Sequence, residues 1–201
     1  MSKKDCKVTD LYDNLDFCKG KPVLPGLAPE AYAIPKAQIA KWPTLPDLDT
    51  EGVTMATLAV YADDFVLAAD AYWRKIDIVT AASNVQTQSQ GEFPSKSFIN
   101  NLTLKYAGND EEAAGFCRLA NADDLVYCVK TRTGKYRIVG HPDFETDTKP
   151  AQDSGMAVTD ASGTTLEISG TDVCPAPFYR GKLKLEGKIL NCATGELEAA
   201  A

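Results

Sequence analysis

The sequence predicts an α+β fold that is mainly β: a β-sandwich or barrel of about seven or eight strands, one flanking α-helix and an extended, Pro-rich N-terminal arm. Three observations lead to this prediction. Short runs rich in β-branched residues begin after residue 51, turn signals separate them, and a single well-capped helical segment lies near 110–121. The expected organisation is an arm over 1–50, a β-sandwich domain over 51–190 and a C-terminal tail over 191–201.

The expected arm is defined by proline, because six of the eleven prolines lie within residues 1–50. Proline fixes φ and removes a hydrogen-bond donor, so neither a regular helix nor a central strand is expected there. The arm nevertheless carries large apolar side chains, among them Leu24, Tyr32 and Trp42. These groups need a surface to lie on, and that surface is either the chain's own domain or a neighbouring subunit.

Strands are expected at 53–61, 65–69 and 72–80, the last with side chains of mixed character on both faces. Residues 97–106 alternate clearly, which predicts a strand with one face toward a core. The residues on that face are Phe98, Asn100, Leu102, Leu104 and Tyr106.

Between these strands lies a long polar stretch, Ser83–Ser97, which contains Gln88, Gln90 and Phe93. A loop of this length usually has a function or is mobile. One interpretation is an exposed hairpin tip. The other is a hairpin extension that is completed only when a neighbouring chain pairs with it, with Phe93 as the apolar anchor.

The helix is expected to begin after Asn109 or Asp110, to bury Phe116, Leu119 and Ala120, and to end at Asn121. A β-hairpin follows over 125–131 and 135–140, with Gly134 supplying a positive φ. A second hairpin is expected over 151–159 and 164–172, then one last strand over 178–188. The Ala-rich end from Glu196 is expected to fray.

Composition restricts the function classes. A net charge of −7 argues against a general nucleic-acid-binding surface, because phosphate binding requires a cationic face. The longest apolar runs are too short for a membrane span, and the polar N-terminus does not resemble a signal peptide. The chain is therefore expected to be made and folded in a cytoplasm. Its six cysteines lack zinc-type spacing and are expected to be free thiols, with Cys117 and Cys128 buried.

No catalytic constellation is expected. The single histidine, His141, lies at a turn before Pro142, and Asp63-Asp64 and Asp123-Asp124 are adjacent pairs that point to opposite faces of a strand. Phosphate-binding, nucleophile-elbow and zinc-protease motifs are absent. The sequence therefore predicts no enzyme, no cofactor and no metal site.

Several motifs in order resemble one family. They are Gln88–Phe98, the helix, Thr133-Gly134-Lys135-Tyr136-Arg137-Ile138-Val139-Gly140, and Ser154–Ile168 with its Asp160-Ala161-Ser162-Gly163 turn. Together with Lys21–Gly26 and Lys41–Pro46, they make the chain similar to the tail tube (major tail) proteins of long-tailed bacteriophages, in particular those of gut Bacteroidales phages.

The resemblance implies a β-sandwich subunit that assembles into sixfold rings, which stack into a hollow tube within the virion tail. The implied partners are the chain itself and other phage tail proteins, while DNA passes without specific binding. The subunit interface would then include Leu24, Tyr32, Trp42, Gln88, Gln90, Phe93 and Phe98. Two alternatives remain: another phage ring, such as a head–tail connector or capsid-associated protein, or a bacterial surface β-domain.

Overall fold

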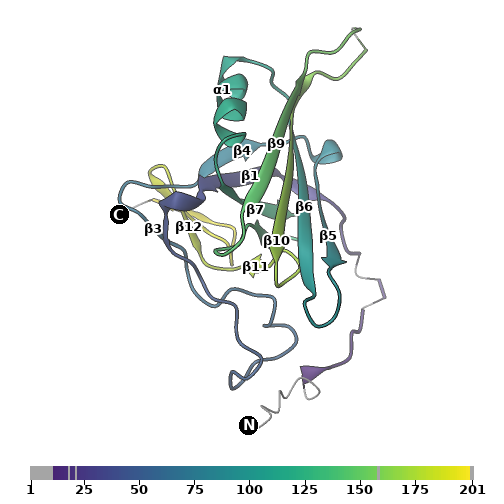
Figure 1. Cartoon of the computed structure of the whole chain (residues 1–201), viewed down its shortest axis with the longest axis vertical. Coiled ribbons are helices and arrows are strands. Elements are labelled where there is room, and N and C mark those ends of the chain that lie inside the picture. The colour runs from purple at the N-terminus through teal and green to yellow at the C-terminus, as the bar shows by residue number, and fades with distance from the viewer. Residues whose placement is uncertain (1–10, 18, 21, 158, 200–201) are drawn as a thin grey trace.

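The computed structural model describes residues 11–17, 19–20, 22–157 and 159–199. It confirms the predicted fold class, with 42% strand, 9% helix and one α-helix in the described part. The strands form antiparallel sheets of five, four, three and two members, so they are shorter and more numerous than the sequence suggested (Figure 1). In chain order the elements are β1 (Leu27–Pro35), β2 (Ile39–Lys41), β3 (Val66–Leu67), β4 (Arg74–Asp77), β5 (Asn84–Gln90), β6 (Ser97–Tyr106), α1 (Glu111–Ala120), β7 (Leu125–Thr131), β8 (Tyr136–Val139), β9 (Thr146–Asp153), β10 (Gly163–Asp172), β11 (Phe178–Tyr179), β12 (Lys182–Leu185), β13 (Lys188–Asn191) and β14 (Leu197–Ala199).

The five-stranded sheet, in the order β11-β8-β7-β1-β4, lies at the centre of the molecule and is buried on both faces. This burial explains why Leu125–Val129 reads as a continuous apolar run, since neither face of β7 meets solvent. One face carries Tyr127 and Val129, and the other carries Val126 and Cys128.

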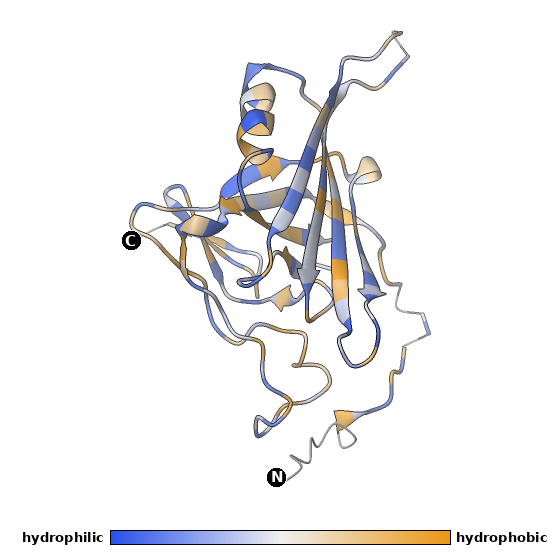
Figure 2. Cartoon of the chain, in the orientation of Figure 1, coloured by the Kyte–Doolittle hydropathy of each residue, from blue (hydrophilic) through white to orange (hydrophobic). Residues whose placement is uncertain are grey.

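The first face packs against the four-stranded sheet, in the order β5-β6-β10-β9, and forms a β-sandwich core. Leu102 and Leu104 on β6 and Leu166 and Ile168 on β10 point into this core and are at most 2% exposed. The alternation predicted for 97–106 is therefore confirmed, and Figure 2 shows the bands of high and low hydropathy along these strands.

The second face is covered by the C-terminal strands β12 and β13 and by the long segment between β2 and β4. Phe65 is the centre of this layer. Its ring lies 5.4 Å from both Trp42 and Trp73 and 5.2 Å from Tyr179, in edge-on or tilted geometries that favour aromatic pairs.

The prediction of an extended arm over 1–50 is wrong for residues 27–41. β1 is a central strand between β4 and β7, and β2 pairs with β3. Pro29 is accommodated because the β1–β7 register shifts between Leu27 and Ala31, so the regular ladder begins only after the proline.

Two further strand predictions are wrong. Residues 55–59 form turns, with the Thr57 amide and the Thr57 hydroxyl both donating to the Thr54 carbonyl. Such local side-chain bonds compete with a sheet ladder. Of the strand predicted over 53–61, only Val60 pairs, in an isolated parallel bridge with Phe178. The single strand expected over 178–188 is instead divided among β11, β12 and the start of β13, and residues 197–199 pair with β13 as β14 instead of fraying.

The helix and the first hairpin form close to their predicted positions. For the second hairpin the predicted first strand over 151–159 is wrong, because β9 is Thr146–Asp153, while β10 matches the predicted return strand. The Asp110 side chain accepts the Ala113 amide at 2.8 Å and caps α1, as expected. The buried stripe differs from the prediction: Ala113 and Ala120 are buried, Phe116 and Cys117 are half-buried, and Leu119 is 71% exposed. Leu119 faces solvent because the sandwich contacts only the 113–116–120 side of the helix.

Candidate assembly surface

The polar stretch Ser83–Ser97 is a strand followed by a tight connection, and it pairs within its own chain. β5 runs antiparallel to β6, with Asn84 opposite Thr103 and Gln90 opposite Ser97. Ser83 fixes its start, since its hydroxyl donates to the Val79 carbonyl and accepts the Lys105 amide. The idea that this stretch needs a neighbour in order to form a hairpin is therefore wrong. The outer edge of β5 has no partner strand in the described part of the chain.

That edge differs from the other sheet edges in its chemistry. β5 reads Asn-Val-Gln-Thr-Gln-Ser-Gln, with neither a charge nor a proline over seven residues. The opposite edge of the same sheet, β9, contains Asp147, Lys149 and Pro150, and β4 carries Arg74, Lys75 and Asp77. Charges and proline are the usual protection against edge-to-edge pairing. β5 is the long edge that lacks this protection.

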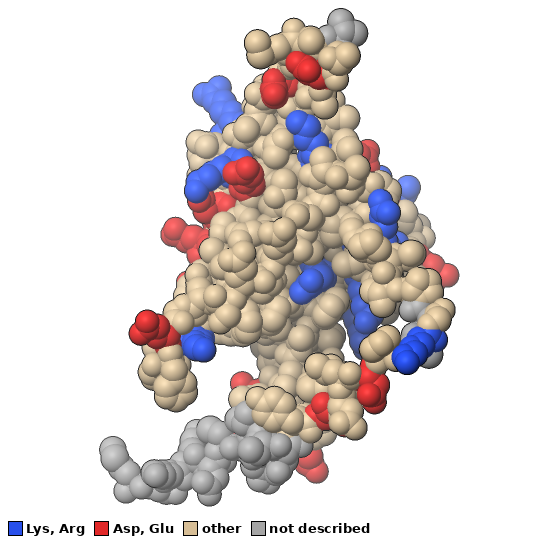
Figure 3. Space-filling view, turned by 90° about the vertical axis from the view of Figure 1, so that its right-hand side faces the viewer, with Lys and Arg blue, Asp and Glu red and all other residues tan. Residues whose placement is uncertain are grey.

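The burial of the sandwich also decreases toward β5. Leu102 on β6 is 1% exposed, whereas the inward-facing Val85 and Thr87 of β5 are only half-buried. A strand with half-covered inward side chains and an open ladder is the position at which a sheet can be extended. Figure 3 faces this side of the molecule and shows a mostly uncharged surface on which Lys and Arg are scattered, not gathered.

At the tip of the β5–β6 hairpin Phe93 is 88% exposed. Gly91 makes the connection possible, because it has φ +78° and an added Cβ would lie 2.6 Å from the Ser95 carbonyl oxygen. Gln90 holds the base of the tip by donating to the hydroxyls of Ser97 and Thr171, both at 3.1 Å. The fold thus presents an aromatic ring on a well-anchored tip.

The residues predicted for a subunit interface divide into two groups. Gln88, Gln90, Phe93 and Phe98 lie together on the β5–β6 hairpin, with Phe98 half-buried opposite Ser89 and Asp172. Tyr32 and Trp42 belong to the chain's own core. Tyr32 is 2% exposed in β1 and donates to Glu30, so a role in subunit contact is wrong for it. Trp42 packs on Phe65 in the same chain.

The predicted Leu24 lies in an N-terminal segment whose other apolar residues the sequence reasoning did not select. Leu24 is 54% exposed, and Tyr12, Leu15, Phe17 and Val23 are between 76% and 89% exposed. The segment leaves the sandwich before β1 and extends past the lower end of the β5–β6 hairpin (Figure 1). Clustered large apolar side chains of this kind mark surfaces that contact something else. Leu15 and Phe17, which lie two positions apart in the sequence, could have indicated this exposed apolar segment.

A buried polar junction lies behind the hairpin. The Asn100 Oδ1 accepts the Ala176 amide at 2.9 Å and the Thr87 hydroxyl at 2.7 Å, and its Nδ2 donates to the Cys174 carbonyl at 3.2 Å. Asp172, 1% exposed, accepts the Cys174 amide through Oδ1, while its Oδ2 has no hydrogen-bond partner in the described part. Burial raises the pKa of Asp172 to about 6, although the amides of Cys174 and Val173 oppose this rise.

The acidic pairs act as structural anchors. Asp63 accepts the Thr44 hydroxyl, and Asp64 accepts the Lys182 amide at 3.0 Å. Asp124 accepts the Thr146 amide at 3.0 Å and pairs with Lys36 at 3.1 Å. In neither pair do both carboxylates share a partner.

His141 lies in the turn after β8. Its Nδ1 accepts the Asp143 amide at 3.1 Å, and its ring packs against Phe144 in a tilted geometry. Burial lowers the pKa of His141, and nearby Lys36 acts in the same direction, while Asp143 opposes them. The imidazole thus serves as a turn acceptor through Nδ1, and its side chain is 12% exposed, whereas a solvated residue was expected at this turn.

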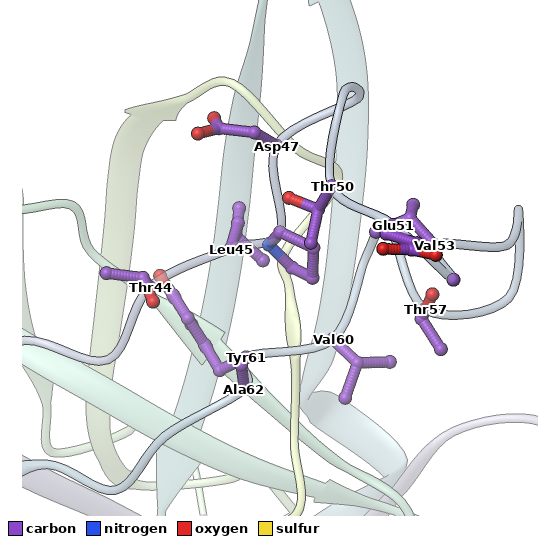
Figure 4. Close-up of a pocket in the computed structure, with 12 residues that line it drawn as sticks. Thr44, Leu45, Asp47, Thr50, Glu51, Val53, Thr57, Val60, Tyr61 and Ala62 are labelled. Carbon is purple, nitrogen blue, oxygen red and sulfur yellow. The ribbon is translucent and has the colours of Figure 1, made fainter.

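A pocket of about 570 Å³ lies within the loop that joins β2 to β3 (Figure 4). Its apolar lining includes Leu45, Val60 and Tyr61, and the carboxylates of Asp47 and Glu51 stand well apart at its sides. This arrangement brings no acid and base together. Over the described ranges no three His, Cys, Asp or Glu side chains are grouped to hold a metal ion. In the same ranges no helix has the length and apolar character to cross a bilayer.

The outward face of the four-stranded sheet is broad and polar. Asn101, Thr103 and Ser169 line a shallow depression on it, together with Asp147, Lys149 and Glu167. Lys149 pairs with Asp147 at 2.9 Å, so part of the charge is neutralised within the face. Amide and hydroxyl groups therefore make up most of this surface.

Comparison with known proteins gives no match to a family model, to a curated protein or to a solved structure.

Proposed function

We propose that the chain is a structural virion protein that self-assembles into stacked rings and forms the tail tube of a long-tailed bacteriophage. The observation that carries the proposal is the unprotected edge of β5. A seven-residue edge without charge or proline promotes uncontrolled association unless it is used. In a subunit made to assemble, the same edge is a specific contact.

The polar outward face supports the same role. Its charged members are Lys105, Lys149, Asp147, Asp153 and Glu167, two basic against three acidic, and the remainder are mainly uncharged amides and hydroxyls. A wall of this composition offers DNA phosphates no cationic track, so DNA would slide along it without adhering. We place this face toward the lumen.

The exposed ends of the molecule supply contacts for rings and stacks. Phe93 at the hairpin tip and Leu15 and Phe17 in the N-terminal segment expose large apolar side chains on different projections. Contacts between unlike surfaces close into rings or repeat along an axis, and a tube needs both. Two further parts of the proposal rest on the resemblance to tail tube proteins. They are the sixfold symmetry of the rings and the binding of other tail proteins.

Negative-stain microscopy of the purified chain tests the proposal. Tubes are the expected result. Closed rings without stacking would favour a connector-type ring instead, and monomers at high protein concentration would refute self-assembly.

A matched pair of proline variants tests the role of the β5 edge. Amides of consecutive strand residues point to opposite edges, and the side chains of Gln88 and Ser89 are exposed. One of Gln88→Pro and Ser89→Pro therefore removes a bond to β6, and the other removes only an outward donor. The outward variant should keep its unfolding midpoint and lose tubes. Tubes from both variants would exclude the edge as an assembly contact.

A further inference from the structure

The segment that could pair with the open β5 edge can be identified by comparing the sheet edges that a second copy offers. β9 is interrupted by Pro150 and carries Asp147 and Lys149. β4 has four residues with three charges, and β11 and β14 have two and three residues. None of these edges offers a seven-residue uncharged ladder to match β5. Among the described edges, only β5 of the second copy does, and pairing β5 with β5 would close a twofold dimer and not a ring. For a ring or tube, the occupant of the edge therefore comes from polypeptide that is not already in a sheet.

Residues 11–17 meet this requirement. Leu-Tyr-Asp-Asn-Leu-Asp-Phe has seven residues, the same number as β5, and it contains no proline. Its residues belong to no strand and bond to no other segment of the described chain. Tyr12, Leu15 and Phe17 are all more than 75% exposed, so their apolar surface has no partner in the monomer.

We infer that residues 11–17 of one subunit add as a further strand to the β5 edge of a second copy. This inference rests on the proposed self-assembly and names the element that makes the contact. In an added strand, alternate side chains face opposite sides of the sheet. Leu11, Asp13, Leu15 and Phe17 would then lie on the inward side, and Tyr12, Asn14 and Asp16 on the polar outward side. An antiparallel register with Phe17 opposite Val85 and Leu15 opposite Thr87 sets Asp13 opposite Ser89, which is exposed.

The burial pattern agrees with this placement. The inward Val85 and Thr87 of β5 are half-buried, whereas Asn100, Leu102 and Leu104 of β6 are 1% exposed, so the core is less covered at β5. Leu15 and Phe17 would cover Val85 and Thr87. Each apolar side chain transferred from water in this way is stabilising in proportion to the area it buries.

The chain is long enough to reach a neighbour. Nine residues separate Phe17 from Leu27 at the start of β1, and they can span about 30 Å when extended. They contain Gly20, Pro22, Pro25 and Gly26, which is typical of a linker and not of a strand. The linker therefore allows residues 11–17 to leave their own subunit.

Amide hydrogen exchange on the full-length chain and on the double variant Leu15→Ser, Phe17→Ser tests the inference. Both substituted side chains are exposed, so the variant should unfold at the same denaturant concentration as the wild type. In assembled wild type, the Asn84–Gln90 amides that point away from β6 should exchange at least about tenfold more slowly than in the variant. A synthetic peptide of residues 10–17 should restore this protection in the variant, and a peptide with the same two serines should not.

The inference is overturned if the double variant assembles with β5 protected as in wild type, or if the intact peptide leaves exchange unchanged. Protection of β5 in a wild-type chain that sediments as a monomer would place the segment on its own β5 and would also overturn it. The experiment distinguishes failure of this inference from failure of the proposed function. If the wild type forms tubes but the peptide does not slow exchange in the variant, only the added strand is refuted. If the peptide slows exchange but the wild type forms neither rings nor tubes, only the tail-tube role is refuted.

Discussion

Replacing Asp172 by asparagine is expected to stabilise the folded chain at neutral pH and to remove a pH dependence that this buried carboxylate creates. The side chain is 1% exposed, and its Oδ2 has no hydrogen-bond partner in the described part of the chain. Asparagine has the same shape and keeps an Oδ1 that accepts the Cys174 amide at 3.0 Å. The substitution therefore removes mainly the charge.

The magnitude follows from the pKa of Asp172, which burial raises from 3.8 to about 6 on folding. Well below pH 3.8 the carboxyl is protonated in both states and folding carries no charge penalty. Between these two values the unfolded state ionises first, so stability falls as the pH rises. Above about pH 6 the full penalty is present, and it amounts to about 3 kcal/mol.

Urea unfolding of both proteins, followed by tryptophan fluorescence at dilute concentration between pH 4 and 8, measures this penalty. The difference in free energy of unfolding between Asp172→Asn and wild type should increase by about 2.4 kcal/mol in favour of the variant over that range, because about 0.6 kcal/mol of the penalty is already present at pH 4. A titration of the Asp172 carboxyl followed by carbon NMR gives the pKa independently. A difference that stays constant with pH would refute the reasoning, because it would mean that water or a cation stabilises the carboxylate in solution.

Three other outcomes are expected. Asn100→Ala leaves the Ala176 amide and the Cys174 carbonyl without a partner, and it should lower the free energy of unfolding in urea by about 3 kcal/mol. The control variant Asn101→Ala, on the outward face, should lower it by less than about 0.5 kcal/mol. Deletion of residues 1–24 should leave cooperative thermal unfolding intact and abolish assembly. Deletion of residues 1–46 also removes β1 and should abolish folding. Cooperative unfolding of the chain that lacks 1–46 would contradict the central position of β1. His141→Ala should leave tube formation by microscopy unchanged with a small loss of stability, and loss of assembly in a folded His141→Ala protein would give the imidazole a role that its contacts do not indicate.

The elements that could be predicted are those whose local signals agree with their environment. β6 alternates because one face meets the core and the other meets solvent, and Asp110 caps α1 in the manner its position suggests. β1 was missed because Pro29 and Pro35 argue against a central strand when read locally. The register shift after Leu27 accommodates the first proline, and the second ends the strand. Neither the register shift nor the end of the strand at Pro35 can be read from the sequence alone.

The candidate surface could be predicted only in part. Gln88, Gln90 and Phe93 were selected because a long polar stretch between two strands needs a reason, and they do lie on one hairpin. Tyr32 and Trp42 were predicted because they are large apolar side chains within a Pro-rich region. Size alone does not distinguish a side chain that packs on another subunit from one that packs in the core of its own subunit. The openness of the β5 edge depends on which strands pair, and strand pairing is a property of the whole fold.

The position of β1 has a consequence for how the chain is synthesised. β1 is complete at Pro35, but the strand beside it, β7, begins at Leu125, 90 residues later. At a translation rate of about 5 to 20 residues per second, β1 emerges from the ribosome about 5 to 20 s before β7 exists. During this interval its apolar residues Ala31–Ile34 have no sheet to complete on the β7 side. The central sheet therefore closes late, and a nascent chain that stalls before residue 131 would expose the segment most prone to pair with other nascent chains on the same message.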